Sequence, residues 1–293
     1  MNNIKLFLLL GCLTGIFVLI GSQFGGSGGA IIALGFAAVM NLGAYFFSDR
    51  IVLAMYRAKE VNEVDEPRLY GTVRLLVQQA RMPMPKVYII EEDAPNAFAT
   101  GRSPKHAAIA ATTGLVRLVS DEELKGVMAH ELAHVANRDI LIGTIAATAA
   151  GAITMIATMI RWGALFGGIG SNRDDENNSG SGGIVAAIAI SIIAPIAAML
   201  IQMAISRSRE YLADQRGARL AGNSMGLANA LRKLELSAGK YEALSSPATA
   251  HMFIVNPLSA KGITRLFSTH PPTAERIARL EAMSKLTNLE VSK

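Results

Sequence analysis

Four long apolar stretches without charged residues interrupt the polar regions of this chain. They are Leu6–Ser22, Gly29–Phe47, Ile140–Ile160 and Gly182–Ser206. A helix of about 20 apolar residues crosses the hydrocarbon core of a bilayer, so the pattern predicts four transmembrane helices. The first stretch is short and resembles a signal peptide, but no small-residue cleavage site follows it, which favours an uncleaved anchor. The last two could form a buried hairpin of a soluble domain, but their length and lack of charge favour spanning.

The polar regions of the chain predict short helices around a small sheet. Glu66–Met82 has the apolar spacing of an amphipathic helix. Ser120 followed by Glu123 predicts a capping box, which opens a helix that runs through about Asn137. Short strands are predicted at Lys86–Ile90, Asn96–Gly101 and Ala107–Thr112, and further helices at Arg207–Leu220, Ser224–Leu236 and Thr273–Leu286.

The apolar stretches divide the chain into three parts. Residues 1–47 hold the first two stretches, residues 140–206 hold the last two, and residues 48–139 together with 207–293 form one polar domain. The composition agrees with this division, because 51% of the residues are hydrophobic and only 17% are charged, against about 25% charged in a soluble domain. We therefore expect a mostly α membrane protein with four transmembrane helices and an α+β domain.

Charge predicts the orientation in the membrane. Lys and Arg gather beside the stretch ends that face the polar domain, whereas the links at residues 23–28 and 161–181 carry no positive excess. The positive-inside rule therefore places both termini and the polar domain in the cytoplasm. The net charge is +5, but the basic residues are scattered and only 6% of the residues are aromatic, so nucleic-acid binding is not indicated. The single cysteine, Cys12, excludes an internal disulfide and a zinc site of paired cysteines.

The sequence His130-Glu-Leu-Ala-His134 carries the chemistry, inside the helix that the capping box opens. Residues four apart share one face of a helix, so both imidazoles can reach one metal ion. Glu131 then lies beside a metal-bound water and can take its proton. The alternative is a pair of surface histidines. The flanking residues are largely apolar, which argues against a solvent-exposed face of the helix. A buried site in which a metal ion is the partner of the histidines is therefore favoured.

A catalytic zinc site usually has three protein ligands, so two histidines leave one ligand to be found. The candidates are His106, His251, His270 and Glu210. Glu210 and Asp214 are four apart on a predicted helix, so one can ligate the metal while the other orients an imidazole. They can equally be a solvated acidic pair among neighbouring arginines, and the spacing alone leaves the third ligand open.

Several motifs together resemble a known family. They are His130-Glu-Leu-Ala-His134-Val-Ala-Asn-Arg-Asp139, Ser208-Arg-Glu-Tyr-Leu-Ala-Asp214, Asn96-Ala-Phe-Ala-Thr-Gly101 and Thr269-His-Pro-Pro-Thr-Ala-Glu-Arg-Ile277. With the four apolar stretches, they make the chain similar to the membrane-integrated zinc metallopeptidases, in the wider family that includes the CAAX prenyl proteases. The resemblance covers nearly the whole chain and implies a gluzincin-type metallopeptidase domain.

The resemblance also implies roles for the residues of the metal site. His130, His134 and Glu210 would hold one Zn²⁺, and Glu131 would be the catalytic base. Asp214 would not bind the metal itself but would orient the imidazole of His130.

The resemblance also implies functional roles for two further segments. Asn96, Ala97, Phe98 and Ala99 resemble the strand with which gluzincins hold substrate, and an edge strand can bind an extended peptide through its backbone. Without the resemblance, we would interpret this segment as an ordinary core strand. His270 and Arg276 resemble a pair that faces the active site, where either can stabilise the oxyanion. The prolines after His270 also predict the start of a helix.

The function that the resemblance implies is proteolytic quality control. We expect a multi-pass zinc endopeptidase of the bacterial inner membrane that cleaves misfolded or damaged membrane proteins at a cytoplasmic active site, as part of a stress response and alongside the AAA protease FtsH. The alternative is a proteolytically weak scaffold or chaperone, against which the intact Glu131 argues. A transporter would place ionisable residues inside the apolar stretches, and none are present.

Overall fold

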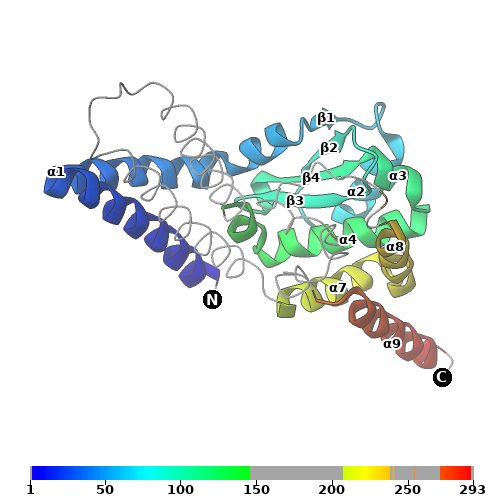
Figure 1. The fold of residues 1–293 in the computed structure, drawn as a ribbon. Helices are drawn as coiled ribbons and strands as arrows, with labels where there is room; N and C mark the ends of the chain where they lie inside the picture. Colours follow the sequence, from blue (N-terminus) through cyan, green and yellow to red (C-terminus); the bar gives the residue numbers. More distant parts are fainter. Residues whose placement is uncertain (1, 146–206, 238–239, 241–253, 255–270, 292–293) are drawn as a thin grey trace.

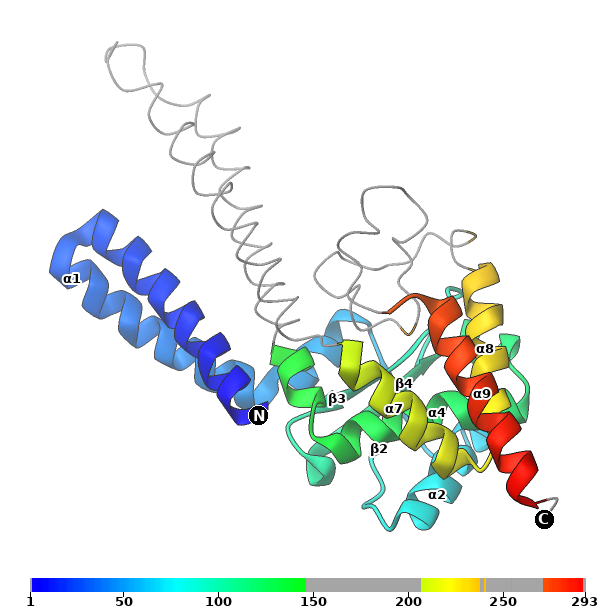
Figure 2. The same ribbon diagram turned by 90° about the horizontal axis from the view of Figure 1, so that it is seen from below.

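A helical arm projects from a domain in which helices pack against a four-stranded sheet (Figures 1 and 2). The structure is a computed structural model, and it describes residues 2–145, 207–237, 240, 254 and 271–291. The domain draws its helices from both sides of the undescribed range 146–206. Helices from the two polar regions of the sequence therefore pack together.

The arm is α1 (Asn2–Met55), which consists of two helices joined at a bend. Gly25 and Gly26 leave the helical conformation there, and Gly26 has a φ of 56°. The two halves lie side by side in Figures 1 and 2, and the Asn41 side chain in one half donates to Thr14 Oγ1 in the other at 2.9 Å. This bond satisfies a polar side chain on an otherwise apolar helix.

Only part of the predicted membrane topology falls within the described residues. Among these, Gly25–Met55 is long and apolar enough to cross a membrane, and Leu10–Leu19 forms a shorter apolar helix. Both halves of α1 expose large apolar side chains, including Phe7, Leu19 and Ile32, as a helix in lipid would. Most of the third and fourth apolar stretches lies outside the described residues, so their spanning remains a prediction.

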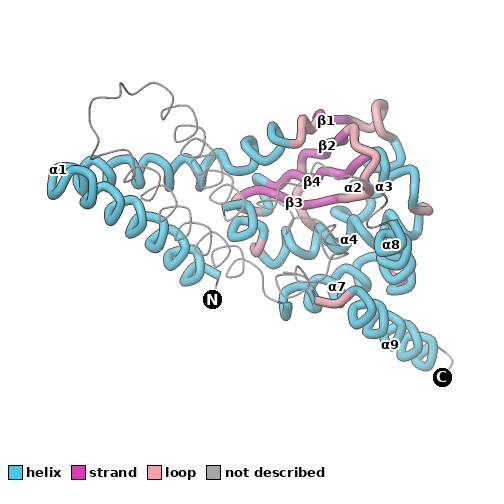
Figure 3. The backbone as a smooth tube through the Cα atoms, in the orientation of Figure 1, coloured by secondary structure: helices cyan, strands magenta, loops and turns pink. Residues whose placement is uncertain are grey.

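The sheet contains every strand that the sequence predicts, and one more (magenta in Figure 3). Its order is β1-β2-β4-β3, with β2 and β4 parallel and the other neighbours antiparallel. The strands are β1 (Lys59–Val61), β2 (Lys86–Ile90), β3 (Ala97–Gly101) and β4 (Ala107–Thr112). β1 was not predicted, because it has three residues and none is buried, so it shows no alternation of apolar and polar positions.

Both faces of the sheet are covered. All six residues of the inner strand β4 are buried, and Ile109 belongs to the large core formed with α2 (Pro67–Ala80) and α4 (Asp121–Asn137). Ala108 and Ala110 face the other way and pack with Val52 and Leu53 at the end of α1. The root of the membrane arm is therefore part of the core of the domain.

The short connections follow their sequence signals. The predicted capping box is present, since Ser120 accepts from the Glu123 backbone and the Glu123 side chain accepts from the Ser120 backbone. η1 (Pro104–His106) leads into β4, and α3 (Thr113–Leu118) follows it, with Thr112 as its N-cap. The apolar stripe predicted for α2 is buried at Leu69, Val73, Leu76 and Val77.

Three further helices complete the domain: α7 (Arg207–Ala221) and α8 (Ser224–Ser237) pack against α4, and α9 (Thr273–Val291) packs against α7 and α8 (Figure 2). Glycines allow the closest crossings. A Cβ on Gly217 of α7 would lie 2.8 Å from the backbone of His130 on α4, and a Cβ on Gly226 of α8 would lie 2.4 Å from the Glu122 carbonyl. Since no side chain fits there, these glycines set the distance between the helices.

Gly217→Ala should destabilise the domain, because the added methyl group must push α7 away from α4. Overpacking of this kind costs about 1–3 kcal/mol, which thermal unfolding in detergent would register as a lower midpoint. Gly71→Ala in α2 is the matched control, since its Cβ meets nothing within 4 Å, and it should be neutral or stabilising by up to about 1 kcal/mol. Equal midpoints for the native and Gly217→Ala proteins would contradict the crossing described here.

Candidate active site

Two imidazoles and a carboxylate converge at the crossing of α4 and α7. His130 Nε2 and His134 Nε2, one turn apart on α4, are 3.1 Å from each other. Glu210, in the first turn of α7, places its carboxylate oxygens 3.7 Å from His130 Nε2 and 3.6 Å from His134 Nε2. The potential ligand atoms of the three residues all lie within 4.8 Å of one another. Of the candidate third ligands that fall within the described residues, Glu210 is the one that lies beside the histidines.

The geometry fits a zinc ion. Two nitrogen ligands at zinc-binding distance in a tetrahedron are about 3.3 Å apart, close to the spacing of His130 and His134. Two imidazoles and one carboxylate are also the ligand set of many catalytic zinc sites. His106, another candidate ligand, is exposed and lies with its Nδ1 3.0 Å from Ser103 Oγ, outside this cluster. His251 and His270 lie outside the described residues.

A second layer of aspartates holds the imidazoles. His130 Nδ1 lies 3.0 Å from Asp214 Oδ1, the partner that the resemblance implied. His134 Nδ1 lies 3.2 Å from both carboxylate oxygens of Asp139. Each aspartate contacts the Nδ1 edge of a ring, so Nε2 of each ring is directed to the common centre beside Glu210.

Asp139 was not predicted to take part in the site, although it ends the motif that begins at His130. Arg138 has a φ of 56° and caps the C-terminus of α4 in the left-handed conformation. The chain therefore turns back, and Asp139 is brought under His134, which lies five residues earlier. Helical spacing cannot show this contact, because it depends on the turn and not on the helix.

Arg276 connects α9 to the same cluster. Its side chain is 1% exposed and donates to both carboxylate oxygens of Asp214, at 2.9 and 2.7 Å. Nη1 also donates to the Ile254 carbonyl at 3.1 Å and lies 3.8 Å from Glu210 Oε2. The guanidinium therefore binds Asp214, the residue that supports His130. Its predicted partner, His270, lies outside the described residues.

Burial and charge together determine the protonation of the site. Burial raises the pKa of Glu131 despite the imidazoles beside it. Burial alone would lower the pKa of His134, but the hydrogen bond to Asp139 and the charge of Glu210 outweigh it and raise the pKa to about 9. Burial would raise the pKa of Asp214, but Arg276 and His130 outweigh it and lower the pKa to about 2. The cluster is thus rich in carboxylate charge and stabilises a cation.

Glu131 lies between the cluster of His130, His134 and Glu210 and the edge of the sheet. It is 6% exposed, and its carboxylate accepts a hydrogen bond from the Ala99 backbone in β3. The catalytic base that the sequence predicts is therefore next to the strand that the sequence predicts to hold substrate.

β3 is the edge strand of the sheet. One hydrogen bond shows which of its residues direct their backbone groups toward β4 and which direct them outward. The Thr112 backbone N–H donates to the Asn96 carbonyl at 2.9 Å, so in the antiparallel pairing the backbone groups of Ala97, Ala99 and Gly101 point away from β4. Ala99 is the one residue of β3 that is not fully buried.

The other two residues of the predicted substrate strand have structural contacts. Phe98 faces the root of α1, with its ring 5.4 Å from that of Tyr56. The Asn96 side-chain oxygen accepts from the Ile254 backbone at 3.2 Å. Of the four residues, Ala97 and Ala99 therefore direct backbone groups to the edge, while Phe98 and Asn96 fix the strand in place.

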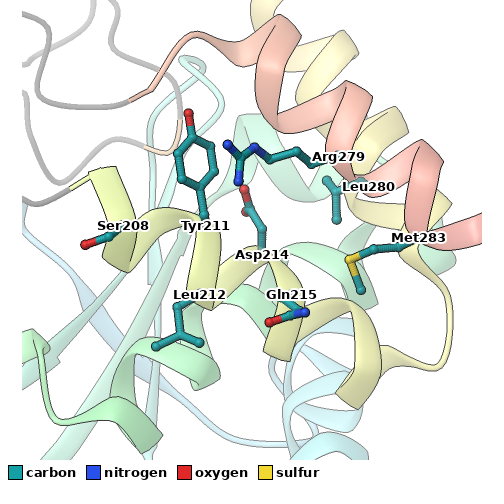
Figure 4. Close-up of a pocket in the computed structure, with 8 residues that line it drawn as sticks. All are labelled: Ser208, Tyr211, Leu212, Asp214, Gln215, Arg279, Leu280 and Met283. Carbon is teal, nitrogen blue, oxygen red and sulfur yellow. The ribbon is translucent and has the colours of Figure 1, made fainter.

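A separate cavity of about 360 Å³ lies between α7 and α9, and the Asp214 side chain lines it (Figure 4). There the Arg279 guanidinium lies 3.8 Å from the centre of the Tyr211 ring. The cavity is lined by Ser208, Tyr211, Leu212, Asp214, Gln215, Arg279, Leu280 and Met283. Neither histidine ligand nor Glu131 lines it, so this cavity is not the place where a scissile bond would meet the base.

A metallopeptidase needs a metal site beside a carboxylate that can take a proton from water, and the cluster with Glu131 next to it fits this class of enzyme. Comparison with known proteins agrees: residues 63–284 match Peptidase family M48, and the chain belongs to this family. It is a metalloprotease, and the resemblance inferred from the sequence is confirmed.

The relatives match along nearly their whole length. A protease HtpX homolog from Pelotomaculum thermopropionicum is 54% identical over 284 residues, which cover 97% of this chain and 100% of the relative. Another, from Thermodesulfovibrio yellowstonii, is 57% identical over 285 residues, covering 97% and 99%. Among solved structures, S. mikatae Ste24p is similar with a TM-score of 0.52 at 18% identity; the match covers 95% of this chain and 64% of that protein. This last likeness concerns the fold alone.

Asp139→Asn should weaken metal binding, because the neutral amide no longer supports the His134 ring with a negative charge. Loss of such a partner typically costs about 10–100-fold in metal affinity, which competition with a chromogenic chelator would measure. Asp121→Asn, at the exposed start of the same helix, is the control and should leave the affinity unchanged. An unchanged affinity in Asp139→Asn would show that Asp139 does not support the ligand.

Proposed function

We propose that this chain is a zinc endopeptidase that cleaves misfolded or damaged membrane proteins and loosely folded polypeptides. The observation that carries the proposal is the convergence of His130, His134 and Glu210 on one point, with Glu131 beside them and against β3. The three ligands would hold one Zn²⁺ per chain.

The residues of the site divide the work of hydrolysis. When bound, zinc lowers the pKa of a water molecule to near 7 and polarises the scissile carbonyl. Glu131 takes the proton of the attacking water and delivers it to the leaving amine. Burial raises the pKa of Glu131, which makes this carboxylate a stronger base than one in water.

Arg276 has an indirect part in this proposal. Its two bonds to Asp214 keep that carboxylate ionised and aligned with His130. The oxyanion can be stabilised by the zinc, by His270 or by Arg276. We retain His270 and Arg276 as candidates for this role, and Asp214 as the support of His130.

Substrate binding is proposed at the outer edge of β3. An extended peptide would pair with the outward backbone groups of Ala97 and with the outward carbonyl of Ala99, whose N–H donates to Glu131. Asn96 and Phe98 would hold the strand in position. Backbone pairing does not depend on side-chain identity, which suits a protease that must cut many different unfolded segments.

The proposed location is the bacterial inner membrane, with several spans and with the active site and both termini in the cytoplasm. Three observations support it: the apolar exterior of α1, the distribution of Lys and Arg, and the relatives named protease HtpX homolog. The lipid bilayer and unfolded membrane proteins are then its partners, with a functional link to FtsH in quality control under stress. A proteolytically weak scaffold is not favoured, because Glu131 is present and positioned.

Glu131→Gln should abolish most proteolysis and keep the metal. The amide has the shape of the carboxylate but cannot take a proton, and loss of a general base typically costs about 10²–10⁴-fold. Casein cleavage by the purified full-length protein, with and without a chelator, measures the activity, and elemental analysis measures the zinc. Glu122→Gln, on the exposed first turn of the same helix, should cleave casein normally. Near-normal cleavage by zinc-loaded Glu131→Gln would contradict the assignment of the base.

Ala97→Pro should raise KM and leave kcat nearly unchanged. Proline removes a backbone donor that points away from β4, so the sheet keeps its bonds while the substrate loses one. One hydrogen bond of about 0.5–1.5 kcal/mol corresponds to a KM roughly 2- to 12-fold higher. Thr100→Pro removes a donor that points toward β4 and should instead unfold the domain. A folded Ala97→Pro enzyme with native KM would show that this edge does not hold substrate.

A further inference from the structure

The carboxyl end of β3 is fixed to the elements that enter the membrane. The Thr100 hydroxyl lies 3.1 Å from the Thr144 hydroxyl, and both residues are buried. Thr144 belongs to the helical residues 140–145, which begin the third apolar stretch. One residue beyond β3, the Arg102 guanidinium lies 5.4 Å from the centre of the Phe46 ring on α1.

The sequence of α1 indicates that this contact between α1 and the end of β3 lies at the surface of the bilayer. Tyr45, Phe46 and Phe47 follow an apolar run, and after Ser48 come the charged residues Asp49 and Arg50. Aromatic side chains followed by charged ones are typical of the membrane–water interface. Because Arg102 lies against Phe46, the carboxyl end of β3 lies at this interface.

The other direction along β3 leads away from the membrane. Ala99 is the residue that contacts Glu131, so the scissile bond is placed opposite it. From Ala99 to Arg102 the chain advances three residues, or roughly 10 Å at the rise of a strand. The amino end of the strand, at Asn96, is tied to Thr112 and Ile254 of the domain. Along β3, the active site is therefore only a few residues from the bilayer in the carboxyl direction. The amino direction leads into the domain.

We propose that substrates enter this edge from the bilayer with a fixed polarity, and this rests on the proposed function of β3. Antiparallel pairing is the more stable arrangement of strands, and a peptide antiparallel to β3 has its amino end at Arg102 and its carboxyl end at Asn96. The enzyme therefore prefers a scissile bond a few residues after the carboxyl end of a membrane-spanning segment. A segment that precedes a membrane span has to fold back on itself to bind.

Two matched substrates test the polarity. Both contain the same transmembrane helix and the same unstructured segment of about a dozen residues; in one the segment follows the helix, and in the other it precedes it. Each is reconstituted with the full-length zinc-loaded enzyme in nanodiscs, where both faces are open, so random orientation affects both equally. The segment that follows the helix should be cleaved roughly tenfold faster, and mass spectrometry should place the cuts about three to six residues from the helix, since tethering confines the reaction to nearby bonds.

A flexible linker provides the control on the slow substrate. About 20 Gly and Ser residues between the helix and the preceding segment allow the chain to turn back, so its cleavage should recover. Equal rates for the two short substrates, faster cleavage of the preceding segment, or no cleavage of either while casein is cut would each overturn the proposal and leave the protease function standing. Loss of casein cleavage as well would overturn both.

Discussion

The structure depends on the crossing of α4 and α7, where two helices from distant parts of the sequence come into backbone contact. Gly217 permits this approach, because any side chain would collide with the backbone of His130. The crossing lays the first turn of α7 against the imidazoles of α4 and so brings Glu210 to the two histidines.

The crossing buries charges that must balance one another. Glu131, Asp139, Glu210 and Asp214 are all at most 6% exposed, and Arg276 is the buried cation that binds Asp214 directly. Arg209 lies near Asp139 and Glu210; burial lowers its pKa while their charges oppose the change. Four buried carboxylates therefore face one buried guanidinium, that of Arg276, and one half-buried guanidinium, that of Arg209. Because unbalanced buried charge is costly, such a cluster favours a bound cation.

Much of this arrangement could be predicted from the sequence where the signal is local. The strands, the capping box of Ser120 and Glu123, and the shared face of His130 and His134 depend on neighbouring residues, and they agree with the structure. The contacts that depend on turns or on tertiary packing could not be predicted. Asp139 reaches His134 through the left-handed Arg138, and the contact of Gly217 with His130 has no local pattern. Glu210 was one candidate among several until the helices were seen to cross.

We propose that His130, His134 and Glu210 hold one zinc ion, and X-ray absorption at the zinc edge of the purified full-length protein is the decisive measurement. We expect a four-coordinate zinc with two imidazole nitrogens at about 2.0–2.1 Å, a carboxylate oxygen at about 2.0–2.2 Å and no sulfur. The Glu210→Ala protein should lose the carboxylate contribution or the metal itself. A spectrum unchanged by Glu210→Ala, or one with fewer than two imidazoles, would contradict the account.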